Sequence, residues 1–397
     1  MDSFIYALVL APALTELLPK SGYPATPGNI GLAGSILFAL FLTGWGLSFI
    51  WGPLADRFGR TKVLAATIFT FSIFTGLAST AQSVWTLGFY RFIAGTGIGG
   101  EWALAGTYIA EAWPEDRRSM GAGYLQTGYY AGFFLAAALN YTIGARYGWR
   151  AMFLVGIVPV LVSIAVLLRV EESKKWETTG GPKRRTAPTV ASILRGKYAK
   201  RTLVAAALLT VAIIGLWAGA VYEPAAVMQI AIKGGMTAVE AGRMASLATG
   251  ILSIGTILGC LVLPPIAERI GRRKTLGIYF AGMAVSIAAG FGWAFYLSNA
   301  LVPFISLLFV LGFFGGNFTI FTLWLPEQFE TRVRATAFAF CTSVGRFIGA
   351  GVNFLLGAAV LRMGTLGVPI ACTSIAFLIG LLLIPLAPET KGQTLPD

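Results

Sequence analysis

The chain has 397 residues, of which 56% are hydrophobic and 12% are charged, and its formal net charge is +13. Soluble domains have about 25% charged residues, so this composition excludes an ordinary soluble protein. The apolar residues form blocks of roughly 20, which suit membrane-spanning helices and are too long for the strands of a membrane barrel. We therefore expect an all-α membrane protein.

Twelve apolar segments can be drawn along the chain. They cover residues 3–18, 31–54, 63–80, 84–110, 119–144, 150–169, 202–231, 242–263, 275–297, 302–325, 336–360 and 366–386. The first segment has no basic leader and no cleavage site, so we interpret it as a truncated first helix rather than a signal peptide. The long polar stretch 171–201 predicts a cytoplasmic linker between two six-helix bundles, residues 1–170 and residues 202–397.

The basic residues predict how the spans are oriented. If the linker is cytoplasmic, 22 of the 30 Lys and Arg residues lie on that side, 6 lie on the other, and Arg91 and Arg346 lie inside spans. This asymmetry follows the positive-inside rule and places both termini in the cytoplasm. The positive charge therefore indicates topology and not nucleic-acid binding. Cys260, Cys341 and Cys372 lie in apolar runs and the chain has no histidine, so we expect no metal site and no cofactor.

A charged hairpin occurs twice. Residues 52–62 (GPLADRFGRTK) return 212 positions later as residues 264–274, and residues 110–119 return 216 positions later as residues 326–335. The matched positions are Asp56 and Glu268, Arg57 and Arg269, Gly59 and Gly271, Arg60 and Arg272, Lys62 and Lys274, Glu111 and Glu327, and Arg118 and Arg334. Charged segments repeated between apolar segments indicate a duplicated membrane protein.

These motifs resemble those of the major facilitator superfamily. Residues 52–62 are similar to its loop signature, and residues 91–100, an arginine followed by spaced glycines, are similar to its fourth-span signature. The run 99–102 (GGEW), with Glu111, Pro114 and Arg118 beyond it, resembles the metabolite:proton symporters, most closely the sialate and monocarboxylate:proton symporter branch. Residues 2–4 resemble the end of that branch's Asp-x-x-Asp-x-Phe pattern, whose first Asp is missing here.

The resemblance implies a fold and a mechanism. The expected fold is twelve transmembrane helices in two pseudo-symmetric six-helix bundles, which give alternating access to a substrate site between them. The expected partners are a small-molecule substrate, protons and the lipid bilayer, and a monomer is expected. Position 268 carries Glu where the loop signature usually has Asp. Glycines 95, 97, 99 and 100 follow no strand, so they predict close helix packing rather than a dinucleotide loop.

Two arginines are candidates for substrate binding. A charge inside a span costs at least about 2.5–3.5 kcal/mol, so each needs a reason. Arg346 and Arg91 both lie close to the predicted midplane, one in each half, and a guanidinium can bind a carboxylate with two hydrogen bonds. Alternatively each arginine pairs within its own bundle, which for Arg91 means an ion pair between spans four and one.

Uncharged polar residues inside the spans are further candidates. They are Gln126, Tyr129, Tyr130, Asn140, Asn317, Asn353 and Tyr222, together with the aromatic residues Trp45 and Trp217. Gln126, Tyr130 and Asn140 lie close to one helical face, which would suit a substrate site. Contacts between helices, or between aromatic residues and lipid, explain the same residues equally well.

Proton coupling requires a group that exchanges a proton near neutral pH. Without histidine, a buried carboxyl is the natural choice, because burial favours its neutral form. The candidates are Glu101, Asp2 and Glu223, the last beside the helix-bending Pro224. Glu101 is about 15 Å along the helix from Arg91, which leaves it no partner on its own helix. The alternatives are pairing with a neighbouring helix or, for Glu223, a solvated helix end.

The repeated hairpins are candidates for a conformational latch between the two bundles. Gly52 and Gly59 would permit the tight turn, and Asp56 would pair with arginines of neighbouring helices. The latch would comprise Gly52, Asp56, Arg57, Gly59, Arg60, Glu111, Arg118, Glu268, Arg269, Glu327 and Arg334. Making and breaking these charge clusters would switch access. Topology alone also explains the basic loops.

The sequence therefore predicts a transporter and not an enzyme. We expect import of a small organic anion, a monocarboxylate or an acidic sugar, with a proton across the bacterial inner membrane. The alternatives are a neutral sugar or metabolite:proton symporter, or a proton-driven exporter. A membrane enzyme or a sensor is disfavoured because the spans carry no cluster of nucleophile, base and metal ligands, and no soluble domain is attached.

Overall fold

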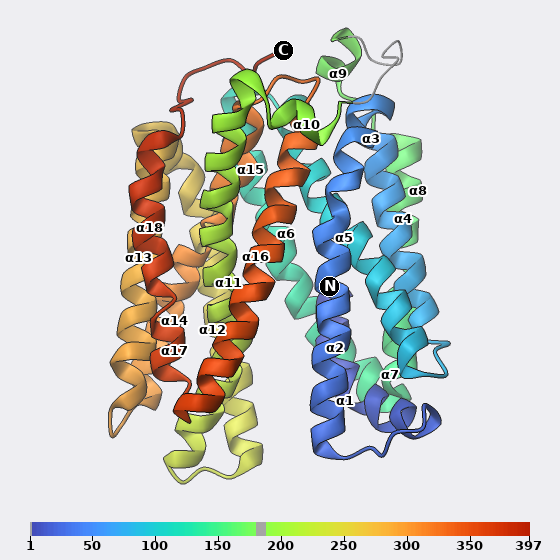
Figure 1. Cartoon of the computed structure of the whole chain (residues 1–397), viewed down its shortest axis with the longest axis vertical. Helices are drawn as coiled ribbons and strands as arrows, with labels where there is room; N and C mark the ends of the chain where they lie inside the picture. Colours follow the sequence, from blue (N-terminus) through green and yellow to red (C-terminus); the bar gives the residue numbers. More distant parts are fainter. Residues whose placement is uncertain (1, 180–187) are drawn as a thin grey trace.

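The computed structural model describes residues 2–179 and 188–397, and within them every regular element is helical (Figure 1). The all-α prediction is confirmed. The first part of the chain contains α1 (Asp2–Lys20), α2 (Pro27–Gly46), η1 (Leu47–Ile50), α3 (Trp51–Phe58), α4 (Arg60–Ala78), α5 (Val84–Ala112), η2 (Glu115–Arg117), α6 (Arg118–Leu139), the π-helical turn η3 (Asn140–Gly144), α7 (Ala145–Val155) and α8 (Pro159–Arg169).

The second part begins beyond the polar stretch. Two short helices, α9 (Lys174–Thr178) and α10 (Val190–Ile193), precede it, and residues 180–187 of the predicted linker lie outside the described residues. The remaining elements are η5 (Gly196–Tyr198), α11 (Ala199–Lys233), α12 (Ala238–Ile270), α13 (Arg272–Gly292), η6 (Ala294–Tyr296), α14 (Leu301–Gly315), α15 (Phe318–Glu327), α16 (Arg334–Met363), α17 (Gly367–Ala371), α18 (Ser374–Leu383) and η7 (Ile384–Leu386).

Many of these helices can cross a membrane. By length and composition, nine helical segments of the described residues are long and apolar enough: Leu32–Phe58, Arg60–Ala78, Arg146–Arg169, Gly196–Gly215, Glu240–Ile270, Arg272–Tyr296, Leu301–Glu327, Arg334–Val360 and Gly367–Leu386. Helices α1, α5 and α6 occupy the other three positions predicted for spans.

Several predicted spans are bent or interrupted. The span predicted at 302–325 is divided into α14 and α15 at Gly316 and Asn317, and the span at 366–386 into α17 and α18. Helix α7 is interrupted at Gly148, whose φ of 81° is not helical. A residue with a side chain rarely adopts this conformation, which glycine adopts readily. Pro159 begins α8, where its missing N–H leaves no helical hydrogen bond unmade.

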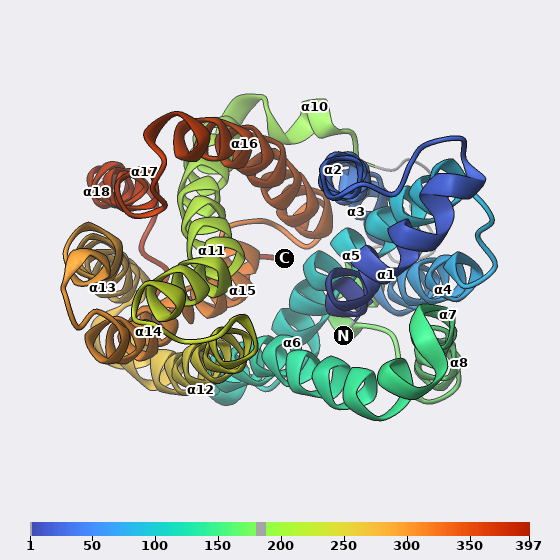
Figure 2. The same ribbon diagram turned by 90° about the horizontal axis from the view of Figure 1, so that it is seen from below.

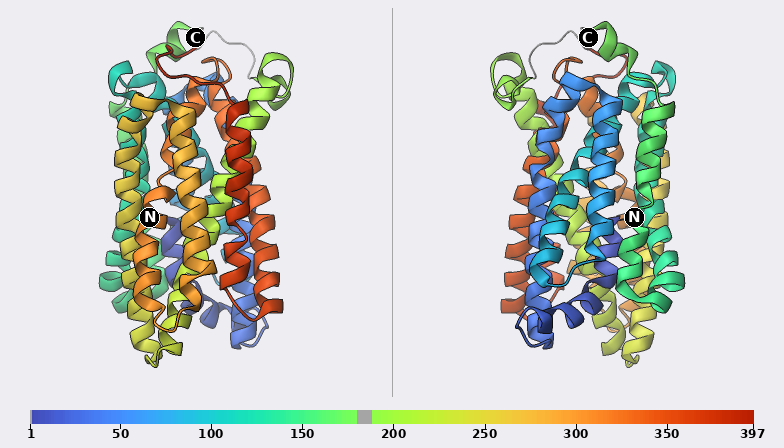
Figure 3. Two further views of the ribbon diagram at one scale, coloured as in Figure 1. Left: turned by 90° about the vertical axis from the view of Figure 1, so that its left-hand side faces the viewer. Right: turned by 90° about the vertical axis from the view of Figure 1, so that its right-hand side faces the viewer.

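The helices lie in two groups that meet at one end. Figure 1 shows α1–α5, α7 and α8 on one side and α11–α14 and α16–α18 on the other. Seen from below in Figure 2, α6 lies beside α12 and α16 lies beside α2, and both pairs are in contact. Helices α9 and α10 and the C-terminal segment all lie at one end of the helices (Figure 3), which we call the linker end. The opposite end is the distal end.

Glycines allow α5 to approach its neighbours closely. A Cβ at Gly95 would lie 2.4 Å from the carbonyl oxygen of Phe41 on α2, and one at Gly97 would lie 2.7 Å from that of Thr67 on α4. Real side chains do not fit at these distances, so glycine is required there. The interpretation of this glycine run as helix packing is confirmed.

Candidate functional site

Arg346 is a buried cation between the two groups of helices. Its side chain extends from α16 toward the first part of the chain and is only 8% exposed. The guanidinium carbon lies 4.3 Å from the centre of the Trp45 ring on α2 and 5.6 Å from that of the Trp102 ring on α5. Among the described residues no carboxylate forms an ion pair with it, and its Nη1 has no hydrogen-bond partner. Arg346 therefore lies against aromatic rings and has no counter-ion in the described part of the chain.

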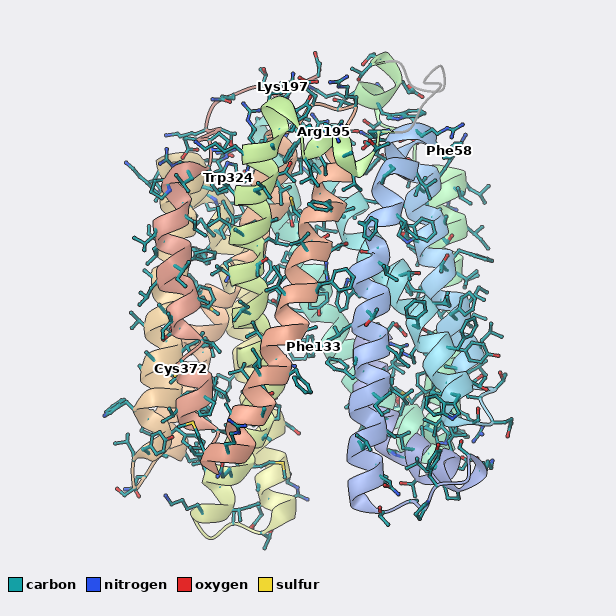
Figure 4. All side chains as sticks on the ribbon, viewed as in Figure 1. Phe58, Phe133, Arg195, Lys197, Trp324 and Cys372 are labelled. Atoms are coloured by element: carbon teal, nitrogen blue, oxygen red, sulfur yellow. The ribbon has the colours of Figure 1, made fainter. Side chains whose placement is uncertain are left out.

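Aromatic and polar residues of α5 and α6 surround this cation. The Trp102 Nε1–H donates to Gln126 Oε1 at 3.0 Å, and Gln126 is also hydrogen-bonded to the Tyr130 hydroxyl. Tyr129, next to Tyr130, interacts electrostatically with Arg346. Figure 4 shows Phe133, one turn further along α6, between the two groups of helices. The structure thus brings together residues named from the sequence, and it adds Trp102. The residues named from the sequence are Arg346, Gln126, Tyr129, Tyr130 and Trp45.

The other polar candidates of the second part have hydrogen-bond partners outside this cluster. The Tyr222 hydroxyl donates to the carbonyl oxygen of Asn353 at 3.3 Å, and the Asn353 side-chain oxygen finds no hydrogen-bond partner within the described ranges. Asn317 precedes α15, where its Nδ2 donates to the Phe314 carbonyl at 3.0 Å and its Oδ1 has no partner. The side chain of Trp217 lies outside the described residues.

Arg91 is held within the first part of the chain. Its Nη1 lies 3.2 Å from Asp2 Oδ1 and donates to Thr75 Oγ1 at 3.3 Å. The rings of Tyr6 and Phe41 lie 4.7 and 4.6 Å from its guanidinium carbon. This geometry matches the alternative of an ion pair between spans four and one. It places Asp2, a candidate for proton coupling, beside Arg91.

Glu101 and Glu223 differ in their surroundings. Glu101 is half-buried and adjoins Trp102 on α5, and its side chain takes part in no hydrogen bond or ion pair found among the described residues. Glu223 is 1% exposed. Its Oε2 accepts a hydrogen bond from Thr249 Oγ1 at 2.9 Å, and its Oε1 has no hydrogen-bond partner among the residues described. Among the described residues, neither carboxyl forms an ion pair with a cation.

At the linker end, Asp56 binds the start of a helix from the other group. Its side chain is fully buried and lies 3.0 Å from Arg60 Nη1. It accepts hydrogen bonds from the Ala335 N–H at 3.3 Å and from the Thr336 N–H and hydroxyl at 2.9 and 2.6 Å. These are groups of the first turn of α16, where backbone N–H groups lack helical partners and the helix dipole favours an anion.

A second carboxylate, Glu111, joins cations from both groups. It accepts two hydrogen bonds from Arg60, from Nε at 3.0 Å and from Nη2 at 2.9 Å, and one from Arg334 Nη1 at 2.6 Å. Arg60 Nη2 also donates to the carbonyl oxygen of Thr331 at 2.7 Å. Asp56, Arg60, Glu111 and Arg334 therefore form one buried network across the two groups.

The repeated cluster in the second part is arranged differently. Glu327 accepts two hydrogen bonds from Arg272, from Nε at 3.1 Å and from Nη2 at 2.8 Å, but Arg118 Nη1 of the first part lies 4.0 Å away. Glu268 is exposed and pairs with Arg272 of its own hairpin at 3.0 Å. Glu268 therefore differs from Asp56, because no hydrogen bond or ion pair with the first part is found for it among the described residues.

Three further expectations for the hairpins are corrected. Gly59 has a φ of 110° and makes the turn, but Gly52 lies inside α3. A Cβ at Gly52 would lie 2.6 Å from the Thr336 Cα, so this glycine permits the approach of α16 rather than the turn. Arg57 and Arg269 are exposed and take no part in the network.

The comparisons with known proteins decide the family. The Major Facilitator Superfamily model matches residues 1–242, and the model described as Sugar (and other) transporter matches residues 229–397. The chain belongs to the major facilitator superfamily. The probable 4-methylmuconolactone transporter of Cupriavidus pinatubonensis is 31% identical over 99% of this chain and 88% of that protein. The sialic acid transporter NanX of Escherichia coli is 34% identical over 36% of this chain and 35% of its own.

The fold agrees with that assignment. A solved structure of the proton:xylose symporter XylE, which belongs to the same superfamily, has a TM-score of 0.81 with 19% identity, and the match covers 99% of this chain and 94% of that one. The major facilitator fold expected from the sequence is confirmed. The matches are to transporters and not to enzymes, so this chain is a multi-pass transporter of small metabolites.

Our sequence analysis missed four residues of this major facilitator protein. Glu172 accepts hydrogen bonds from the backbone N–H groups of Arg60 and Thr61, and Glu389 from those of Arg272 and Arg273. Ser173 donates to Glu111 at 2.6 Å, and Thr390 to Glu327 at 2.5 Å. Residues 172–173 and 389–390 stand 217 positions apart, nearly the offset of the other repeats, so the duplication itself would have revealed them.

Glu389 lies beyond η7, outside the apolar spans. Burial alone would raise the pKa of this carboxyl, but the backbone N–H groups of Arg272, Arg273, Lys391 and Thr390 hold its pKa below the ordinary value. Glu389 therefore stays charged and caps the start of α13.

Proposed function

We propose that this transporter moves a small organic anion, a monocarboxylate or an acidic sugar, across the membrane together with a proton. The observation that supports this most is the environment of Arg346: a buried guanidinium with aromatic faces around it and, among the residues that the structure describes, no carboxylate to balance it. A buried unpaired charge is costly, and an anionic substrate between the two groups of helices would supply the missing partner. The name of the relative NanX, a sialic acid transporter, is consistent with an acidic substrate.

The proton is assigned to a carboxyl near this site. Glu101 adjoins Trp102, whose ring faces Arg346. Because no cation among the described residues forms an ion pair with Glu101, burial favours its neutral form whenever the conformation shields it from water. Asp2, paired with Arg91, is a second proton site in this proposal, and Glu223 in the second part is a third. The remaining polar residues Asn317, Asn353 and Tyr222 would contact the rest of the substrate.

The linker end is assigned to the cytoplasm of a bacterial cell, with both termini inside and the chain acting as a monomer in the inner membrane. The excess of Lys and Arg at that end supports this orientation. Residues 1–170 and 202–397 would rock as two bundles, joined by residues 171–201. The network of Asp56, Arg60, Glu111 and Arg334 would then close the cytoplasmic side, leaving the site open to the outside.

Transport in proteoliposomes with an imposed pH gradient tests this proposal. For the wild type, we expect uptake of a carboxylate driven by an acidic exterior. Replacing Arg346 with Gln should lower substrate affinity about 10- to 100-fold, because hydrogen bonds to a charged group contribute about 1.5–3 kcal/mol. Arg362→Gln, an exposed arginine near the end of the same helix, is the matched control and should behave like the wild type.

The alternatives give different results. Uptake that does not respond to the pH gradient would contradict proton symport. Unchanged affinity in Arg346→Gln, or transport of neutral sugars in preference to acids, would favour a neutral sugar or metabolite symporter. Substrate movement out of the vesicles, driven by protons that enter down their gradient, would indicate a proton-driven exporter.

A further inference from the structure

Two unpartnered hydrogen-bond donors meet at the candidate site. Arg346 Nη1 and Trp45 Nε1 are both buried, and neither has a partner among the described residues. The two side chains are in contact, with the guanidinium carbon 4.3 Å from the centre of the indole ring. Both groups can only donate, so neither can satisfy the other. Contact with the ring face offsets part of the cation's charge, but it supplies no acceptor for either N–H.

The position of the Trp45 ring is fixed by α5. A Cβ at Gly99 would lie 2.3 Å from Trp45 Cδ1, the carbon next to the indole nitrogen. Glycine at this position therefore lets the edge of the ring that carries the N–H lie against α5. Trp102 follows Gly99 by three residues and so lies on the same side of α5.

Trp102 presents a rigid aromatic surface to the same place. Its N–H is already used by Gln126. Its ring is held edge-to-face by Phe338 and Phe318 of the second part, at 5.2 and 5.9 Å between ring centres. With its N–H occupied, Trp102 offers Arg346 a ring and no further donor. The charged end of a ligand therefore has two donors available, Arg346 and Trp45, beside an aromatic surface.

We propose that one carboxylate accepts hydrogen bonds from both Arg346 and Trp45, and that Trp102 and Tyr129 make the site select flat, conjugated acids over puckered, saturated ones. This rests on the proposed function, that the substrate is an anion. An acceptor shared by α16 and α2 would tie the two groups of helices together when substrate binds. A flat π system can stack against the face of an aromatic ring, whereas a puckered saturated ring cannot approach that face as closely.

Three small probes separate charge from shape. Benzoate is a flat acid, cyclohexanecarboxylate is a puckered acid of nearly the same size, and benzamide is flat and neutral. Binding to the full chain in detergent is measured by isothermal titration calorimetry. We expect benzoate to bind about tenfold more tightly than cyclohexanecarboxylate, a difference of one strong contact, and benzamide not to bind.

Two substitutions assign the effects to residues. Trp45→Phe keeps a ring and removes the N–H, so both acids should lose about tenfold in affinity while their ratio is unchanged. Trp102→Leu removes the flat surface, so the ratio of the two affinities should fall toward one. Trp85→Phe and Trp85→Leu, at an exposed tryptophan near the start of α5, are the matched controls. If Trp102 had only a structural role, Trp102→Leu would weaken the binding of both acids equally and leave the ratio of their affinities unchanged.

The outcomes separate this inference from the proposed function. Equal binding of the two acids overturns the selection of flat acids and leaves the anion proposal standing. Unchanged affinity in Trp45→Phe overturns the shared carboxylate. Binding of benzamide but of neither acid overturns both proposals, as does the absence of binding by all three probes.

Discussion

Two arginines at similar predicted depth have opposite surroundings. Arg91 is matched by Asp2 at 3.2 Å inside one group of helices, so its charge is balanced by the protein. Arg346 has rings on its faces and no acid beside it among the described residues. In both cases aromatic rings stabilise the cation. Of the two, only Arg346 leaves a charge for a ligand to balance, and in the proposed function this difference makes Arg346 the substrate-binding arginine and Arg91 a structural one.

The carboxylates at the linker end make stability depend on pH. Glu389 has a pKa below its ordinary value because backbone N–H groups of α13 and of its own turn donate to the charged form. Its contribution is therefore present above the pKa of an unfolded glutamate, about 4.3, and is lost as the pH falls through the lower pKa of the folded state.

We predict that Glu389→Gln lowers the free energy of unfolding near pH 7 by roughly 0.5–2 kcal/mol, the usual contribution of a helix cap, and removes this part of the acid sensitivity. Thermal unfolding in detergent between pH 7 and pH 4 measures both effects. The exposed Glu177, changed to Gln, is the control. Curves for Glu389→Gln and the wild type that stay parallel down to pH 4 would contradict the prediction.

At the scale of elements, the hairpin works through the contact of α3 with α16. Gly52 lies where a Cβ would come within 2.6 Å of the Thr336 Cα and 2.7 Å of the Ala335 carbonyl oxygen. Both neighbours are backbone atoms, which cannot move aside as a flexible side chain would. The two helices can approach this closely only because residue 52 has no side chain, and this approach lets Asp56 reach the start of α16.

Gly52→Ala should therefore separate α3 from α16 and weaken closure of the linker end. We expect spin labels on the exposed Lys62 and Lys200, in a background without the three cysteines, to show a longer and broader distance distribution than in the parent protein. Gly242→Ala on α12 is the matched control, because a Cβ there would meet nothing within 4 Å. Distance distributions that coincide for the two variants would contradict this role for Gly52.

The sequence predicted the elements better than it predicted the site. Apolar length located the spans, and the repeated charges identified Asp56, Arg60, Glu111 and Arg334, which the fold brings together. It offered Trp45 as a candidate but could not show that its ring is buried. Trp45 is 5% exposed and Trp85 is 59% exposed, yet hydropathy is the same for a ring that faces a site and one on the outer surface. Contacts of Trp45 with Arg346 join positions about 300 residues apart, and no local pattern records them.

At the scale of the whole molecule, the contacts between the two groups concentrate toward the linker end. Along α16 they include Thr336 with Asp56, Phe338 at Gly106, Ser343 with Ser48, and Phe347 at Gly46. Beyond Arg346, Phe354 and Leu355 of the same helix are 79% and 67% exposed. Figure 1 shows α16 and α2 diverging in that direction. In the proposed mechanism this is the state closed to the cytoplasm.

The C-terminal segment adds a further connection at this end. Lys175 of α9 donates to the carbonyl oxygen of Leu395 at 2.9 Å and lies 3.3 Å from Asp397 Oδ1, while Arg334 donates to the carbonyl oxygen of Pro396. Arg334 thus links this segment to Glu111 of the first group. Closure at the linker end therefore rests on several contacts, of which Asp56 supplies the one that binds a helix start directly.

Replacing Asp56 with Asn tests whether that contact sets the balance between the two states. The amide cannot pair with Arg60 as a carboxylate does, and it binds the positive end of α16 more weakly. If the state with a closed linker end loses about 1–3 kcal/mol of stability, its population relative to the state with an open linker end falls about 5- to 150-fold. Spin labels at Lys62 and Lys200 should then report a longer distance at the linker end, while labels at Tyr23 and Lys233 report a shorter one at the distal end.

The paired measurement distinguishes rocking from local loosening. If Asp56 only stabilised its own hairpin, Asp56→Asn would lengthen the distance at the linker end and leave the distal distance unchanged. Asp116→Asn, an exposed acid near the same end of the protein, is the control and should change neither. Because the two groups of helices would move as bodies about the central site, opposite changes at the two ends are what alternating access requires.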